Sequence, residues 1–254
     1  MKPLWAAYSA LGTIAFLIFL LLAAPATLVA DQIGSRLAGF TARGVEGRAI
    51  SGALSGVRWR EIGINRLIWR WRPLALLGGQ LGVTFQTEDP DIQLASQAAI
   101  GLNRQMTLAD LTGRLPLNRI SHLAMVGHLP LEGQLVLDLR KLTLDATGRP
   151  TAAQGAIRLL NLRVNLGQPL PLGDYELRLD SASPEGIQGK LKDLSAPLAL
   201  EGALNLQPDG RYRFTGQAMV RDPGNQALRQ AMSLLGPPGA DGRWPLNFSG
   251  TLPL

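Results

Sequence analysis

The sequence predicts a mainly β protein, in which an N-terminal transmembrane helix precedes an antiparallel β-sheet with one or two short helices. Three observations support this prediction. A run of 28 uncharged residues separates Lys2 from Asp31. In the segments that follow, apolar and polar residues often alternate, which is the pattern of half-buried strands. Glycine and proline, 29 and 17 in number, are spread between these segments, as turn residues are in all-β proteins.

The uncharged run predicts a membrane anchor over residues 1–30. About 20 apolar residues cross a bilayer core as a helix, whereas a cleaved secretory signal has a shorter apolar region behind a more basic start. An uncleaved anchor is therefore favoured over a signal peptide with its cleavage site at Ala24-Pro25-Ala26. Pro25 is expected to kink or end the helix. Residues 31–254 then make up a second, β-rich domain.

The charges that flank the run do not by themselves favour export. Arg36, Arg43 and Arg48 follow the run, and taken alone they indicate a cytoplasmic domain. Long domains, however, are exported largely regardless of flanking charge. We therefore expect a single-pass protein with residues 31–254 outside the cytoplasm.

Alternation also predicts the individual strands. In the first, Leu67, Trp69 and Trp71 share one face while arginines occupy the other. Further strands are expected over residues 81–85, 135–144, 157–166, 175–179, 198–206, 212–214 and 244–248.

Irregularities in the pattern predict bulges, turns and helices. The alternation slips by one residue at Arg140-Lys141 and at Leu159-Leu160, where we expect a bulge or a bend. The sequence Gln207-Pro208-Asp209-Gly210 predicts a tight hairpin turn. Asn225 is a suitable N-cap for a helix that ends at Gly236-Pro237. A helical turn is also expected within residues 120–126, and residues 31–40 are expected to extend the anchor helix.

The sequence contains no recognisable catalytic, cofactor-binding or metal-binding pattern. Cysteine is absent, and the two histidines, His122 and His128, have neither zinc-protease nor zinc-finger spacing. The acidic cluster Glu88-Asp89-Pro90-Asp91 lacks the pattern of a calcium loop, so a solvated loop is expected there. We therefore predict a protein that is not an enzyme and takes no cofactor.

The densest polar feature is the stretch from Arg43 to Arg72, which holds seven arginines and three tryptophans. Arginine and tryptophan are enriched at binding hot spots, although arginine stacked on tryptophan is also a common structural device. Contact with phospholipid headgroups is a third interpretation, because the stretch follows the anchor closely. The candidate partner or headgroup contacts are Arg58, Trp59, Arg66, Trp69, Arg70, Trp71 and Arg72.

Several motifs follow one another in a recognisable order. Residues 67–79 are similar to a W-x-x-x-P-L-x-L-L-x-G motif, and residues 45–52 to a V-x-G-T-L-W-x-G motif in which Ala49-Ile50 replaces the Leu-Trp pair. The order continues through residues 170–175, 198–202, 208–212 and 242–246. Together these motifs resemble the type II secretion system protein N family, also called general secretion pathway protein N.

The resemblance implies a bitopic inner-membrane protein with its domain in the periplasm. It implies an accessory role, without enzymatic activity, in the machine that moves folded proteins across the outer membrane, and contacts with other components of that machine. It also implies a curved, AsmA-like sheet with an apolar groove. The alternative function is therefore an AsmA-like lipid-handling protein in the periplasm, whereas a nucleic-acid partner is not expected there.

Overall fold

The computed structural model of the chain describes residues 8–9, 12–13, 16, 19, 23–36, 39–59, 62–120, 130–165, 168–183 and 186–252. These residues form one large antiparallel sheet with a few short helices, which confirms the predicted mainly β fold. Among them, no helix is both long enough and apolar enough to cross a membrane. The predicted anchor, residues 1–30, lies largely outside the described residues.

The elements begin with helix α2 (Thr27–Arg36), after which strands follow almost without interruption. The other helical segments are the 3-10 helix η1 (Pro73–Gly78), α3 (Leu117–Ile120) and α4 (Gln226–Ser233). The strands are β1 (Phe40–Thr41), β2 (Gly44–Arg48), β3 (Ser51–Trp59), β4 (Ile62–Arg72), β5 (Gln80–Glu88), β6 (Gln93–Gly101), β7 (Met106–Pro116), β8 (Leu131–Leu144), β9 (Pro150–Asn165), β10 (Pro169–Ser183), β11 (Gly186–Asp193), β12 (Leu198–Leu206), β13 (Arg211–Val220) and β14 (Trp244–Thr251).

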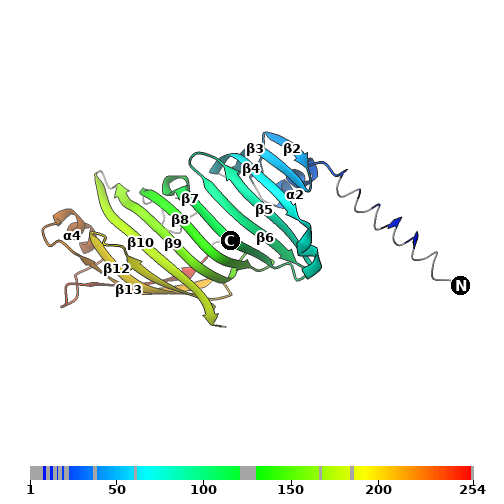
Figure 1. Ribbon diagram of the computed structural model, residues 1–254. Helices are drawn as coiled ribbons and strands as arrows, with labels where there is room; N and C mark the ends of the chain where they lie inside the picture. The colour runs from blue at the N-terminus through cyan, green and yellow to red at the C-terminus, as the bar shows by residue number, and fades with distance from the viewer. Residues whose placement is uncertain are drawn as a thin grey trace.

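Neighbours in the sheet are nearly always neighbours in the chain. From β3 to β14 each strand pairs antiparallel with the next one, while β1 and β2 both pair with β3. Such sequential pairing needs only hairpin-type connections. Figure 1 shows the result, with β2 to β5 at one end of the sheet and β12 and β13 at the other.

Helix α2 covers one face of the first strands and forms a small core with them. Ala26, Leu54, Val57 and Trp69 are buried in this core. Just ahead of α2, Pro25 forms an isolated antiparallel β-bridge with Arg48. The amide of Ala26 donates a hydrogen bond of 3.3 Å to the carbonyl oxygen of Gly47. Pro25 therefore interrupts the helical backbone as expected. Residues 31–36 are helical, but they belong to the separate helix α2 rather than to an extended anchor helix.

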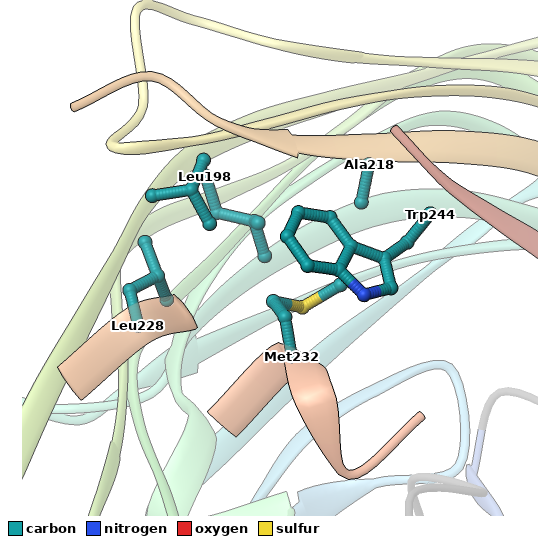
Figure 2. Packing of buried hydrophobic residues seen from close by; sticks show 6 residues of the cluster. Leu198, Ala218, Leu228, Met232 and Trp244 are labelled. Carbon is teal, nitrogen blue, oxygen red and sulfur yellow. The ribbon is translucent and has the colours of Figure 1, made fainter. Parts of the chain in front are cut away.

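A second core lies under α4 at the other end of the sheet. Leu228 and Met232, four residues apart on α4, point to the same side of the helix and are buried against Leu198, Ala218 and Trp244 (Figure 2). The side chain of Asn225 accepts a hydrogen bond from the Leu228 amide at 3.1 Å. The predicted helix and its N-cap are thus confirmed, although the helix ends at Ser233 and a turn leads from there to Gly236.

Both predicted slips are confirmed as irregularities of register. The pairing of β8 with β9 shifts between Leu139 and Lys141. Around the second slip the pairing of β9 with β10 shifts twice, and Asn161 has a φ of 52°. An extra residue of this kind turns the following side chains to the other face, which keeps the apolar residues on one side.

The remaining turn predictions have different outcomes. Gly210, with a φ of 88°, closes the predicted hairpin by donating its amide to the carbonyl oxygen of Gln207 at 2.9 Å. Helix α3 ends at Ile120, where the other predicted helical turn begins. Residues 121–129, which include His122 and His128, lie outside the described residues.

Candidate interaction surface

Strand β4 separates the candidate contact residues into two faces, as the alternation predicted. Across the pair with β5, Trp69 lies opposite Phe85 and Trp71 opposite Val83, whereas Arg70 lies opposite Thr84. The tryptophans therefore belong to the face that α2 covers, and the arginines to the opposite face.

Trp69 lies within the protein rather than on its surface. It is 7 % exposed in the core under α2, and its indole Nε1 donates a hydrogen bond of 3.0 Å to the carbonyl oxygen of Ala49. A buried indole N–H with a backbone partner is a satisfied structural group. The position of Trp69 thus favours the structural interpretation for this residue.

The arginines of β4 line the exposed face. Arg66 makes ion pairs with Glu46 at 3.1 Å and with Glu88 at 3.8 Å, both in exposed surroundings where such pairs add little stability. Arg70 and Arg72 are also exposed, and Arg72 donates to the Oε1 atom of Gln97. These side chains are accessible to a partner.

Arg58 and Trp59 lie apart from the other candidates. They stand at the end of β3, where half-buried Trp59 pairs across the strands with Phe40 and Ile62. Trp71 and Arg72 are at the end of β4. Because β3 and β4 are antiparallel, the end of β3 lies beside the start of β4, so Arg58 and Trp59 are far from Trp71 and Arg72. The seven candidate residues therefore do not form a single patch.

The apolar face continues from the α2 core to the α4 core. In one row across adjacent strands, Leu137 pairs with Ile157, Ile157 with Leu177, and Leu177 with Leu191. All four are half-buried rather than fully buried. The described elements thus leave this central part of the face incompletely covered. The predicted alternation identified the face, but the extent of its covering depends on helix positions that alternation does not encode.

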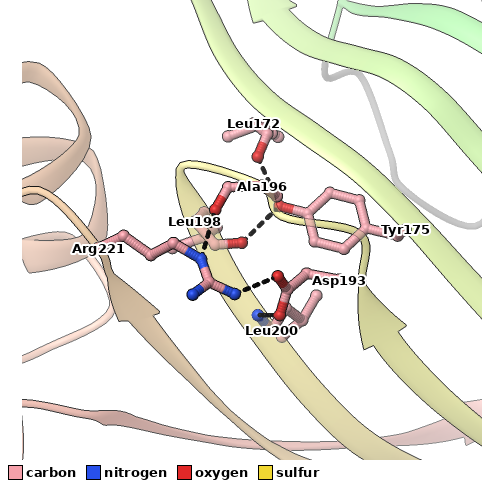
Figure 3. A network of polar contacts seen from close by, with 7 residues as sticks. All are labelled: Leu172, Tyr175, Asp193, Ala196, Leu198, Leu200 and Arg221. Carbon is pink, nitrogen blue, oxygen red and sulfur yellow. Dashed lines mark hydrogen bonds and ion pairs between the residues drawn. The ribbon is translucent and has the colours of Figure 1, made fainter.

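A polar network joins β10 to the turns beside it (Figure 3). The Tyr175 hydroxyl lies 2.8 Å from the carbonyl oxygen of Leu172 and 3.0 Å from that of Leu198. Burial, together with the charges of Asp193 and Asp174, raises the pKa of the Tyr175 phenol. The phenol therefore remains a hydrogen-bond donor at neutral pH.

Asp193 is the acidic member of this network. Arg221 donates to its Oδ2 atom, and Arg221 also donates to the carbonyl oxygen of Ala196 at 2.9 Å. Burial acts to raise the pKa of the Asp193 carboxyl, but the hydrogen bonds from Arg221 and from the Leu200 amide outweigh it and lower the pKa. The network fixes the β11–β12 turn and offers no unsatisfied group for chemistry.

Two other carboxylates have structural roles as well. The hydrogen bond from Arg158 at 2.8 Å, and a second from Arg178, lower the pKa of the buried Glu176 carboxyl. In the acidic loop, Asp89 accepts bonds from the amides of Asn65, Asp91 and Ile92 at 2.8 to 3.0 Å. The acidic cluster is thus a loop, as expected, that is pinned to β4 by Asp89. Within the described residues, no group of three or more possible metal-ligand side chains is present.

The described residues thus form a β-rich protein of one large antiparallel sheet, with an apolar face and a polar face. The comparisons identify the family. The model of the type II secretion system protein N family matches residues 38–247, and the chain belongs to this family.

Several proteins named type II secretion system protein N are similar to this chain over most of their length. A type II secretion system protein N from Aeromonas hydrophila is 28% identical over 251 residues, which cover 96% of this chain and 97% of the relative. The protein of that name from Klebsiella pneumoniae is 29% identical, with 92% and 91% covered. The one from Vibrio cholerae is 26% identical, with 84% and 86% covered. No solved structure matches the chain.

Proposed function

We propose that the chain is an accessory component of the type II secretion system, tethered to the inner membrane by residues 1–30 and acting in the periplasm through protein–protein contacts. The observation that carries the proposal is the family match, which takes in the sheet from β1 into β14. The relatives are named for type II secretion. The described carboxylates with lowered pKa values serve structural hydrogen bonds, which fits a role without catalysis.

The connection between the tether and the sheet supports this arrangement. The amide of Ala49 donates to the carbonyl oxygen of Ala24 at 2.9 Å, and Ala26 is 2 % exposed beneath the first strands. The chain that leaves residue 24 toward the N-terminus is therefore attached to a fixed point on the sheet. A tether attached in this way holds β2 and β3 near the bilayer.

The proposal is tested by topology and by secretion. Alkaline phosphatase fused after residue 254 is expected to be active, and an inactive fusion would contradict export of the sheet. In a host that depends on type II secretion, deletion of the gene is expected to leave folded substrates in the periplasm, and the intact gene to restore their secretion. Unchanged secretion after deletion would contradict the proposed role.

Photo-crosslinking can identify the contacts. Arg70 is the suitable position for the photoreactive residue because it is exposed, and Arg213, which is exposed on the distant strand β13, serves as the control. Crosslinks from position 70 to a known secretion component are expected. Crosslinks to lipid alone, with no secretion component captured, would count against a protein contact at this face.

The alternative, AsmA-like lipid handling by a curved sheet, is favoured by one observation. The central row from Leu137 to Leu191 is half-buried among the described elements, and Leu81 and Ile100 on the same face are 60% and 46% exposed. An apolar face of this kind suits acyl chains. Lipid that co-purifies with the full chain, and is lost when Ile157 is replaced by Asp, would support this alternative; purification without lipid would contradict it.

A further inference from the structure

Six large apolar side chains are exposed together at one corner of the sheet. Leu74, Leu76 and Leu77 in η1 are 77%, 47% and 87% exposed. Leu81 at the start of β5, Ile100 near the end of β6 and Leu102 in the following turn are 60%, 46% and 94% exposed. Soluble surfaces seldom gather so many large apolar groups without a binding role. We name these six residues the apolar corner.

Backbone pairing brings the three segments of the corner together. Leu81 pairs with Ile100 and Gln80 with Gly101, so the β6–β7 turn that carries Leu102 lies beside the start of β5. Helix η1 lies over the face of β5 to which Gly82 belongs, because a Cβ placed on Gly82 would be only 2.7 Å from the Cβ of Ala75. Leu81 and Ile100 project from the other face at the same strand ends, so the corner presents apolar side chains on both sides of the sheet. Ala75 thus faces the strand, while the leucines on either side of it project outward.

The charged side chains in the corner's own segments are basic. Arg70 and Arg72 precede η1 directly, and Arg104 follows Leu102 in the same turn; all three are exposed. The segments from residue 62 to 87 and from 92 to 109 contain no Asp or Glu. Apolar side chains set among basic ones are the pattern of a surface that lies in the interface of an anionic membrane.

The position of the corner in the fold agrees with a membrane surface. Helix η1 joins β4 to β5, two strands of the same end of the sheet that α2 covers (Figure 1) and to which Ala24 is bonded through Ala49. A protein partner would be expected to meet acidic as well as basic groups at the rim of an apolar patch. The corner's own segments offer only basic ones, and the acid beside them, Asp110, is linked to Arg72 through Gln97, which donates to Asp110 at 3.3 Å.

We propose that the apolar corner inserts into the interfacial layer of a membrane that contains anionic phospholipid, and so forms a second contact beside the N-terminal tether. The inference deepens the proposed function and rests on it, because it requires the tether to hold this end of the sheet at a bilayer. The two contacts together would fix the orientation of the sheet relative to the membrane, which a single tether does not do.

The absence of cysteine from the chain makes a direct test possible. In the full chain, Leu77→Cys and Leu102→Cys are each labelled with an environment-sensitive fluorophore. The matched control is Leu194→Cys, at an exposed leucine in the β11–β12 turn. Strand β11 is six places from β5 in the antiparallel sheet, so the two strands run in the same direction. Leu81 lies at the start of β5 and Leu194 follows the end of β11. The control position is therefore distant from the corner and at the opposite edge of the sheet. The labelled proteins are reconstituted into vesicles of phosphatidylethanolamine and phosphatidylglycerol.

Insertion is read from quenching by phospholipids brominated on their acyl chains. Emission from positions 77 and 102 is expected to fall about twofold, as for groups at the boundary of headgroups and acyl chains, and that from position 194 to stay unchanged. Substitution of Arg72→Glu together with Arg104→Glu is expected to reduce the quenching at position 77, whereas Arg213→Glu on β13 is expected to leave it unchanged. Phosphatidylcholine vesicles are expected to give weaker quenching than anionic ones.

The test separates the inference from the proposed tether. Flotation of the full chain with the vesicles reports membrane association by either contact, whereas quenching at positions 77 and 102 reports the corner alone. Flotation without quenching at positions 77 and 102 would overturn the insertion of the corner and leave the tether intact. Failure to float would contradict the proposed tether and, with it, this inference. Protection of position 77 only when a secretion component is added would assign the corner to a protein partner and overturn the proposal.

Discussion

The indole Nε1 of Trp69 donates a hydrogen bond of 3.0 Å to the backbone carbonyl oxygen of Ala49. This bond ties β4 to the turn between β2 and β3, and the amide of Ala49 in turn donates to the carbonyl oxygen of Ala24 at 2.9 Å. One side chain thus supports the point where the N-terminal segment meets the sheet. Arg70, its neighbour in sequence, is exposed on the opposite face.

Replacement of Trp69 by Ala is therefore expected to destabilise the fold strongly. The change removes a large side chain from the core under α2 and leaves the Ala49 carbonyl without its partner. The expected loss is about 3–5 kcal/mol of unfolding free energy. Urea unfolding followed by circular dichroism measures it. Arg70→Ala is the control, and it is expected to change the free energy by less than about 0.5 kcal/mol. Equal effects of the two changes would contradict the division of β4 into a core face and an exposed face.

The stability of the protein is expected to decrease in acid, in part through Asp193. Its carboxyl has a lowered pKa in the folded state, so its ionised form stabilises the fold above the ordinary aspartate pKa of about 4. This contribution is lost as the pH falls through the lowered folded-state pKa. Unfolding free energies measured from about pH 5 down to about pH 2 should therefore decline less steeply in Asp193→Asn than in the parent chain.

The control for Asp193 is an exposed carboxylate of the same sheet. Asp180 on β10 is exposed and makes no ion pair among the described residues. Asp180→Asn is expected to change the unfolding free energy at neutral pH by less than about 0.5 kcal/mol, as surface substitutions usually do. An identical slope for Asp193→Asn and the parent would show that the bond from Arg221 does not contribute to stability.

Helix α4 is expected to depend on its cap and on one leucine. Leu228 is 1% exposed, so Leu228→Ala should cost about 2–5 kcal/mol. Asn225→Ala removes the acceptor for the Leu228 amide and should cost about 1 kcal/mol. Gln230→Ala, on the exposed side of the helix, should be nearly neutral. Thermal unfolding of the three variants ranks their losses of stability. A Leu228→Ala variant as stable as the parent chain would contradict the packing of α4 on the sheet.

Local pattern predicted the faces of the strands well. The alternation at Leu67, Trp69 and Trp71 assigned the correct face to each residue, and the slips at residues 140 and 160 marked real bulges. Both are properties of consecutive residues, because side-chain direction in a strand has a period of two. The cap at Asn225 was predictable for the same reason.

Roles that depend on distant segments were not predictable. Nothing next to Trp69 in the sequence shows that its partner is the carbonyl of Ala49. Likewise the exposure of Leu77 depends on how η1 lies over Gly82, which the sequence of residues 73–79 alone does not show. The candidate contacts in the Arg43–Arg72 stretch were chosen by residue type, and only the pairing of β4 with β3 and β5 divides them into core and surface.

Gly202 provides the last prediction, because it makes room for an aromatic ring. A Cβ at this position would lie 2.5 Å from Cζ of Phe214, and that ring stacks on Phe248 of the edge strand β14 with centroids 6.2 Å apart. Gly202→Ala is therefore expected to displace Phe214 and to cost about 1–3 kcal/mol by overpacking. In Phe214→Leu the clash is relieved, so the double variant should be more stable than the sum of the single changes predicts, by about 0.5 kcal/mol or more. Urea unfolding of the four proteins in this cycle measures the coupling. Additive effects would mean that the ring of Phe214 does not occupy the space above Gly202, and that its stacking on β14 is independent of that glycine.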